Sequence, residues 1–466
     1  MNDVPPGDRR LNRWEWAIVA TTAALVLYYA VMTEIRSCFL QRRMTDFGVY
    51  LRAAWAARTG HDLYAVTCNN GWHYCYPPPF ALLLTPLADP PAGFPRAGYL
   101  PYPVSVGIWI LASYAFAFWT VQALARRIVP EAVPGSRRWW SARLGPLLVC
   151  APGIGYTIVH GQVNTLVAAL ITAMVLAGIA GRRLAAGVWL AAAAAVKVVP
   201  AFLLLVPLLH RDRRAVLGVV LGAVLVLGVL PAGFFGIVGT LREYEKFVDQ
   251  VLVPGTTGGG DQTRAKELTA TVATDSHSFQ AVIHNWRNPT AATRPPNADS
   301  ITRLAHWAII AGMTAVTLWV GGRHRKGGPP DQLVLVAAFV LVMVLASPVS
   351  HVHHYAMALP AIAGLWLKGL TDRPGHAWPA GAITVPLVVW CAATGLPLIP
   401  TREFVLLREF GLGTAATVAI WLICLDRLSG RWCRPEIGTG QTAARSGPFG
   451  ACHFPSFAAA KRALSR

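Results

Sequence analysis

Long apolar stretches recur along the chain from Trp14 to Leu425 and alternate with short polar segments. Each runs for roughly 17 to 25 residues, the length that a helix needs to cross the hydrocarbon core of a bilayer. Runs this long and continuous favour helices over barrel strands, because backbone groups in lipid must be hydrogen-bonded internally. The pattern predicts an all-α polytopic membrane protein. The expected full spans are residues 14–32, 103–125, 143–159, 163–180, 215–237, 302–321, 332–347, 355–371, 378–396 and 409–426.

One apolar segment, residues 184–209, carries basic clusters at both ends. A single crossing would leave one cluster on the outer side, so we expect a hairpin of two short helices with Lys197 and Pro200 at its tip. Broken helices at membrane depth are tolerated where they line a cavity. A straight span with Lys197 at its centre is the alternative, and it carries a large cost for the buried charge. With the hairpin, about 10–12 transmembrane helices are expected.

Basic residues mark one side of the predicted bundle. Arg and Lys cluster at alternate ends of the spans, and such loops stay in the cytoplasm. Residues 1–13 and a Gly-, Ser- and Arg-rich tail at 428–466, expected to be disordered, then lie inside. Residues 14–427 form one transmembrane domain with long outer loops at 33–102 and 239–300. A basic flank without a cleavage site indicates an uncleaved signal anchor in the cell (inner) membrane.

The first outer loop begins with an amphipathic stretch. Its apolar residues recur at helical spacing: Phe47, Tyr50, Leu51, Ala54 and Trp55. Arg52 and Arg58 fall on the other side, which is typical of a helix that lies on the membrane surface. Residues 80–87 are apolar but too short to span, so a re-entrant or interfacial segment is expected.

Composition supports the membrane class and limits the partners. Charged residues make up 14% of the chain, against about 25% in soluble domains. The formal net charge is +19. Most basic residues stand where cytoplasmic flanks need them and suit the anionic headgroups of membrane lipids, so nucleic acid is not expected as a partner.

Unusual polar residues gather on the predicted outer side. Asp46 is a lone carboxylate at the start of the amphipathic helix. It is either an acid favoured there by the helix dipole or a general base, with its pKa raised by partial burial and tuned back by a nearby cation. His160, Gln162 and Asn164 crowd into one turn between two helices. A plain turn explains the glycine and a capping Asn, whereas the cluster of donors and acceptors suits sugar hydroxyls.

Lys197 and a histidine-rich segment are the other candidates. A lone Lys in an apolar segment indicates a functional site, with phosphate as its natural partner; snorkelling to the interface is the plain alternative. His351, His353 and His354 are spaced closely enough to bind metal. Because no Asp, Glu or Cys is adjacent, hydrogen bonding to phosphate or sugar is favoured, and no metal or cofactor is expected. Residues 276–278 (Ser-His-Ser), with His284 and Asn285, are further candidate contacts.

These residues stand in motifs that resemble glycosyltransferase family 87. Members are integral-membrane enzymes of the GT-C superfamily that use polyprenol-phosphate sugars and are typified by α-mannosyltransferases. The matching segments, in order, are Asp46–Tyr50, Ala53-Ala54, Gly60–Tyr64, Tyr76–Phe80, Gly161–Asn164, Lys197–Pro200 with the Leu-rich run to Arg211, and Ser347-Pro348 with His353-His354. The resemblance extends over residues 14–430.

The resemblance implies inverting transfer at the outer membrane face. The donor would be a sugar, most often mannose, linked through one phosphate to a polyprenol, and the acceptor an envelope glycolipid or glycan. Asp46 would deprotonate the acceptor hydroxyl, and Lys197, His353 and His354 would bind the phosphate. Sugar hydroxyls would be positioned by His160, Gln162 and Asn164, and Tyr50 and His351 complete the substrate-binding set. Relatives often carry Asn-x-Ser near residues 276–278 and a Trp where His351 stands, which leaves the sugar and the acceptor open.

Two other functions fit a polytopic membrane protein. A lipid-linked oligosaccharide ligase or polymerase would share the outer site but would carry more Arg in its outer loops. A transporter or flippase would show internal symmetry and polar residues spread through the midplane. Here the polar residues cluster at one end and no repeat is found, so the sequence favours a polyprenyl-phosphate-sugar-dependent hexosyltransferase.

Overall fold

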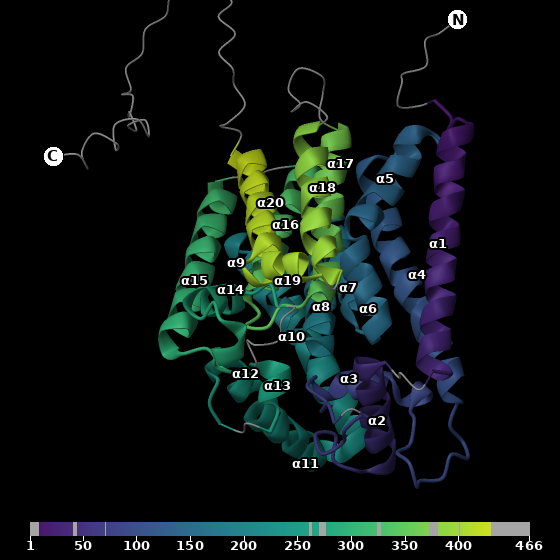
Figure 1. Ribbon diagram of the computed structural model, residues 1–466, viewed down its shortest axis with the longest axis vertical. Helices are drawn as coiled ribbons and strands as arrows, with labels where there is room; N and C mark the ends of the chain where they lie inside the picture. The colour runs from purple at the N-terminus through teal and green to yellow at the C-terminus, as the bar shows by residue number, and fades with distance from the viewer. Residues whose placement is uncertain are drawn as a thin grey trace, which may run out of the picture. The chain divides into compact units, whose positions relative to one another are not determined.

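The computed structural model describes residues 9–40, 44–69, 71–260, 263–269, 276–323, 328–371, 381–399 and 401–429. The tail predicted to be disordered lies outside these ranges from residue 430 onward. Within them the chain is helical and contains only isolated β-bridges, no strands (Figure 1). The all-α prediction is therefore confirmed.

Six helical segments are long and apolar enough to cross a membrane within the described ranges. They are α1 (Arg13–Cys38), α4 (Tyr102–Ile128), the continuous run Arg213–Thr257, α15 (Ser300–Arg323), α16 (Pro329–Ala346) and α20 (Leu412–Ser429). A bent pair, α5 (Arg137–Val149) and α6 (Ala151–His160), makes a seventh candidate with a break of 59°. Shorter apolar helices accompany them, among them α7 (Asn164–Ile179) and α18 (Gly381–Gly395). The protein is an integral, multi-pass membrane protein.

The predicted hairpin at 184–209 is confirmed. Helix α8 (Arg183–Val196) ends where Lys197 adopts an extended backbone, with φ −148° and ψ 131°. The chain then returns through η3 (Val199–Leu204) and α9 (Leu205–Leu209). The two ends of the hairpin meet, since Arg183 Nε lies 3.4 Å from Asp212 Oδ2 at the start of α10 (Arg213–Ala223). The straight span does not occur.

Helix α2 (Thr45–Thr59) differs from the predicted surface helix. Most of its residues are buried, including Arg52, whose guanidinium lies 3.4 Å from the Asp89 carboxylate and donates to the Asp89 carbonyl oxygen. The segment after α3 (Pro78–Leu83) and η2 (Thr85–Leu87) folds back over α2 and supplies this partner. Arg52 is therefore an internal ion-pair residue, and only Arg58 of the two is exposed.

The predicted outer loop 239–300 is largely helical. After α10 the chain continues through a π-helical stretch, η4 (Val224–Val229), then α11 (Leu230–Phe247), η5 (Val248–Leu252) and α12 (Val253–Thr257). Two further helices, α13 (Ala265–Leu268) and α14 (Phe279–Arg287), and η6 (Ala291–Thr293) follow. Leu, Arg, Glu and Lys are strong helix formers, so the polar composition of 241–246 suits a helix as well as a loop.

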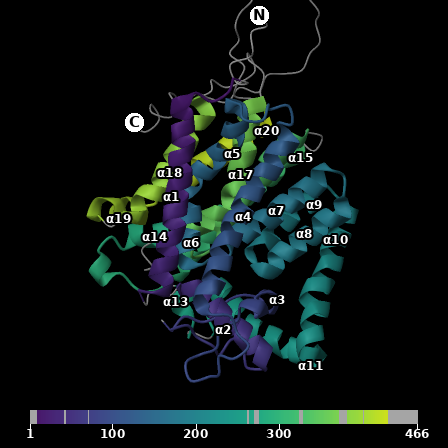
Figure 2. The same ribbon diagram turned by 90° about the vertical axis from the view of Figure 1, so that its right-hand side faces the viewer.

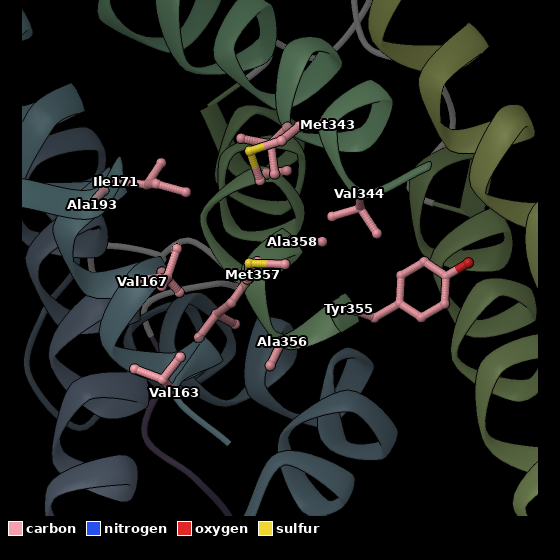
Figure 3. Packing of buried hydrophobic residues seen from close by; sticks show 14 of the residues in the cluster. Val163, Val167, Ile171, Ala193, Met343, Val344, Tyr355, Ala356, Met357 and Ala358 are labelled. Carbon is pink, nitrogen blue, oxygen red and sulfur yellow. The ribbon is translucent and has the colours of Figure 1, made fainter. Parts of the chain in front are cut away.

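The packed centre of the bundle is α16. Its residues from Leu333 to Leu345 are all buried, as expected of a helix that is apolar all round. It packs against α15, α17 (Leu359–Thr371) and α20, with η8 (Leu396–Leu398) and α19 (Arg402–Glu409) leading into α20. Figure 3 shows Val163, Val167 and Ile171 on one side of the core cluster that also includes Met343 and Met357. Helices α2, α3 and α11 gather at one end of the bundle (Figures 1 and 2).

Candidate active site

The turn after α6 docks on the start of α2. Gly161 adopts φ +70°, and its N–H and that of Gln162 close the helix end on Ile158 O and Thr157 O. A Cβ on Gly161 would run into Phe47 Cβ and would lie 2.9 Å from Met44 Sδ. The Trp109 indole N–H donates to the Gly161 carbonyl at 3.0 Å. Only glycine fits here, and the contact holds Asp46 beside the turn.

Gln162 links this turn to two tyrosines and to Asp46. Its Oε1 lies 3.2 Å from the Tyr50 hydroxyl and 3.0 Å from the Tyr76 hydroxyl. The two hydroxyls lie 2.7 Å apart. The Gln162 side chain is also hydrogen-bonded to Asp46. Gln162 and Tyr50 are buried, while Asp46 and Tyr76 keep partial exposure.

Asn164 connects Lys197 to the histidine-rich segment. Lys197 Nζ donates to Asn164 Oδ1 at 2.9 Å, and Asn164 Nδ2 donates to the His353 carbonyl at 2.9 Å. Thr157 Oγ1 donates to the same carbonyl at 3.1 Å. Lys197 is buried, and its ammonium lies 5.9 Å from the centre of the Tyr76 ring. The broken helix thus points its cation at the residues that surround Asp46.

The histidines form one cluster with Tyr156. The His353 ring centre lies 4.6 Å from His354, 5.3 Å from His351 and 6.2 Å from His160. Tyr156 packs on His160 at 4.4 Å and stacks with His353 at 6.1 Å. Across the described ranges, no group of three or more His, Cys, Asp or Glu is arranged to hold a metal ion. The ring nitrogens of the cluster can donate and accept hydrogen bonds.

Residues 276–278 hold the histidine-rich segment in place. Ser276 forms a β-bridge with His351, and the His277 N–H donates to the Ser350 carbonyl at 2.7 Å. Ser278 donates to Pro348 O at 2.6 Å and caps α14. The other candidates in this loop bind elsewhere, because His284 pairs with Pro295 O and Asn285 with Glu409 O. The structure gives this loop a supporting position rather than a place among the site residues.

Burial and nearby cations act in opposite directions on Asp46. Burial raises the pKa of the Asp46 carboxyl above its usual range, and this is the larger effect. The charge of His160, the hydrogen bond from Gln162 and the charges of Lys197 and His351 lower the pKa in part. Such a carboxylate is suited to accept a proton.

All nine predicted site residues come together: Asp46, Tyr50, His160, Gln162, Asn164, Lys197, His351, His353 and His354. Sequence reasoning missed Tyr76 and Tyr156. Tyr76 was recognised only as part of the matching segment Tyr76–Phe80, without a role in the site. Tyr156 lies four residues before His160 on the same helix face, the one signal that was available.

One carboxylate, one buried lysine and many hydrogen-bonding groups thus meet at the ends of membrane helices. The model of glycosyltransferase family 87 matches residues 74–348, more than half of the 466-residue chain. The protein belongs to glycosyltransferase family 87, and the resemblance seen in the motifs is confirmed. The matched range includes His160, Gln162, Asn164 and Lys197, whereas Asp46 precedes it and His351–His354 follow it.

Individual relatives are more distant. The polyprenol-phosphate-mannose-dependent alpha-(1-2)-phosphatidylinositol mannoside mannosyltransferase of Mycobacterium tuberculosis (strain ATCC 25618 / H37Rv) is 26% identical over 402 residues, 83% of this chain and 82% of its own. Crystal structures of ArnT from Cupriavidus metallidurans, bound to undecaprenyl phosphate and in the apo state, are 16% and 14% identical. They cover 88% and 89% of this chain and 78% of their own, with a TM-score of 0.35.

Proposed function

We propose that this glycosyltransferase transfers mannose from a polyprenyl-phosphate carrier to an envelope glycolipid or glycan, with inversion at the sugar. The observation that carries the proposal is the meeting of Asp46, Lys197 and the His351–His354 segment around the turn at His160–Asn164. The mannose and polyprenol-phosphate donor named for the mycobacterial relative support the choice of substrate.

Asp46 serves as the general base in this proposal. Its carboxylate takes the proton of the acceptor hydroxyl while that oxygen attacks C1 of the sugar. The bond between C1 and the phosphate oxygen breaks, and polyprenyl phosphate leaves with the electron pair. One base and one displacement invert the configuration at C1. Partial exposure of Asp46 and His160 lets an acceptor approach.

Lys197, His353 and His354 bind the phosphate. An ammonium group surrounded by protein interacts with a phosphate more strongly than it would in water. The hydrogen bond to Asn164 fixes the position of Lys197 before substrate arrives. Little reorganisation is then needed as negative charge accumulates on the leaving phosphate.

His160, Gln162 and Asn164 position the sugar, with Tyr50, Tyr76 and His351 around it. Amide and imidazole groups can both donate and accept hydrogen bonds, and sugar hydroxyls also do both. Gln162 and the two tyrosine hydroxyls already form one network, so a bound hydroxyl enters a set of groups with fixed orientation.

We place the site on the extracytoplasmic side of the inner membrane, with the N-terminus in the cytoplasm. The support is the distribution of arginines: Arg13, Arg126, Arg127 and Arg137 stand at the helix ends remote from Asp46 along α1, α4 and α5. A lipid-linked donor and a membrane acceptor are both accessible at that boundary.

A donor-selection assay tests the proposal. Full-length protein in nanodiscs receives radiolabelled mannose on polyprenyl phosphate, on polyprenyl pyrophosphate or on GDP, with a membrane lipid extract as acceptor. We expect transfer from the monophosphate donor alone and a product of the opposite anomeric configuration. Transfer from the pyrophosphate or nucleotide donor, or retained configuration, would contradict it.

A further inference from the structure

A cavity of about 310 Å³ lies among α7, α8, α9 and α16, and none of the active-site residues line it. Its volume falls within the range of about 300 to 1,000 Å³ that is usual for small-molecule sites. Most of its wall is apolar, as shown by Val175, Leu190, Val206 and Leu335.

Polar lining residues collect where the helices end. Arg183 is the first residue of α8, His210 follows α9, Asp212 caps α10 and Gln332 lies in the first turn of α16. Leu190 lies seven residues beyond Arg183 on α8, about 10 Å deeper at 1.5 Å per residue. The cavity thus has a polar mouth and an apolar interior, which matches the polar headgroup and apolar chains of a membrane lipid.

The mouth is strongly basic. Arg183 lines it, and four further exposed arginines adjoin lining residues in the chain: Arg182, Arg211, Arg213 and Arg214. Asp212 is the only acidic residue between positions 182 and 214. Basic pockets between helices at the level of the headgroups are suited to anionic lipids.

Arg211 holds an unfavourable backbone conformation at this mouth. With φ 53°, it is the only non-glycine residue of the described ranges in the left-handed region. The Asp212 N–H donates to Pro207 O at 2.9 Å, a helix cap at which glycine is usual. This strained position thus carries a charged side chain instead of the usual glycine, which adds to the positive charge at the mouth.

We propose that this cavity binds one anionic phospholipid of the surrounding bilayer. An acyl chain occupies the apolar interior between α7, α8 and α16, and the headgroup phosphate lies on Arg183 and its neighbouring arginines. The lipid is a second ligand, separate from donor and acceptor, and its binding does not depend on the proposed reaction.

Native mass spectrometry of the full-length protein tests this. The protein is released from nanodiscs with equal phosphatidylglycerol and phosphatidylcholine, and we expect one retained phosphatidylglycerol per chain. The triple variant R183Q/R211Q/R214Q should lower that retention about tenfold or more. The control R126Q/R127Q removes exposed arginines at the end of α4 that do not line the cavity and should leave retention unchanged.

A volume test examines the interior separately. A Cβ on Gly178 meets nothing within 4 Å, so Gly178→Leu adds a bulky apolar group to the cavity wall, and Gly178→Ala is the matched control. We expect loss of the lipid in the leucine variant only. Equal retention of both phospholipids, displacement of the lipid by millimolar inorganic phosphate, or wild-type retention in the triple and leucine variants would overturn the proposal. The readout is independent of glycosyl transfer, so either proposal can fail alone.

Discussion

The pKa of Asp46, the proposed base, depends on its burial and on the charge of His160. Burial keeps the pKa of Asp46 above that of an ordinary aspartate, and the charge of His160 is the largest of the effects that lower it again. Only the ionised carboxylate accepts a proton, so activity rises with pH as Asp46 loses its own proton.

Removing His160 should therefore move the acidic limb of the pH–rate profile. In His160→Ala the pKa of Asp46 rises further, because its main lowering charge is gone. The limb should shift to higher pH, measured as kcat/KM against pH with a lipid-linked donor. A limb that stays in place or moves to lower pH would separate His160 from the base.

Lys197 contributes a single charge to the site, and that charge can be removed at nearly constant size. We expect Lys197→Gln to lower kcat by roughly 10²-fold, the usual effect of losing one group that stabilises transition-state charge. Lys246→Gln is the matched control, since Lys246 lies on α11 and is paired with Glu243 of the same helix and with Asp62, which follows α2. If Lys197→Gln kept wild-type turnover, Lys197 would have no part in phosphate departure.

Among single residues, the sequence predicted those whose burial near lipid costs free energy. A lysine, an aspartate and several histidines near membrane helices are candidates for a functional site by residue type alone. Tyr76 and Tyr156 were not predicted, because a tyrosine is also common as an ordinary packing residue. Residues 276–278 were candidate substrate contacts, but in the structure their hydrogen bonds hold the segment that carries His351.

The elements of the site meet at Gly161. The turn between α6 and α7 touches α2 so closely that a side chain at this position would displace Phe47, one residue from Asp46. The same turn places Gln162 and Asn164, so one glycine determines the distance between the base and the residues around it.

Gly161→Ala should therefore cost both stability and activity. Gly60→Ala is the control, because Gly60 has φ +73° but nothing within 4 Å of its Cβ, so it carries the backbone strain without the collision. We expect a loss of about 1 kcal/mol for Gly60→Ala and about 2–4 kcal/mol for Gly161→Ala, the difference being overpacking. Thermal unfolding in detergent measures both. Equal losses would show that the contact with α2 is unimportant.

Elements were predictable where charge and length favoured one solution. Arginines at both ends of 184–209 favoured a hairpin over a straight span, and Lys197 marked its break. Arg52 was assigned to the water-facing side of α2 because its partner, Asp89, lies outside the helix and only the fold brings it near. Residues 239–257 were assigned to a loop because polar residues were taken to indicate irregular structure, although most of residues 241–246 are strong helix formers.

Charge also organises the whole molecule. Arginine-rich helix ends lie remote from Asp46 on α1, α4 and α5, which underlies the proposed orientation. The apolar runs predicted where the helices lie, but fewer of them are long enough to span than the ten expected: six in the described ranges, or seven with the bent pair. The meeting of α2, α6, η3 and η7 (Val352–Ala358) around one point could not be predicted, since long-range packing leaves no local pattern in the sequence.

Cysteine labelling tests the orientation. Ala97 and Val133 are both exposed, the first between η2 and α4 and the second between α4 and α5. In intact cells a membrane-impermeant maleimide should label Ala97→Cys above the background of the native cysteines, and Val133→Cys only after permeabilisation. The reverse pattern would place the active site in the cytoplasm.

The most direct measurement of the central claim is single-turnover transfer by Asp46→Asn in nanodiscs loaded with polyprenyl-phosphate mannose. Asparagine keeps the shape and loses the base, so we expect the rate to fall by about 10²- to 10⁴-fold while donor binding persists. Asp62→Asn removes a partly exposed carboxylate paired with Lys246 and should stay near the wild-type rate. An Asp46→Asn enzyme as fast as the Asp62→Asn control would contradict the account.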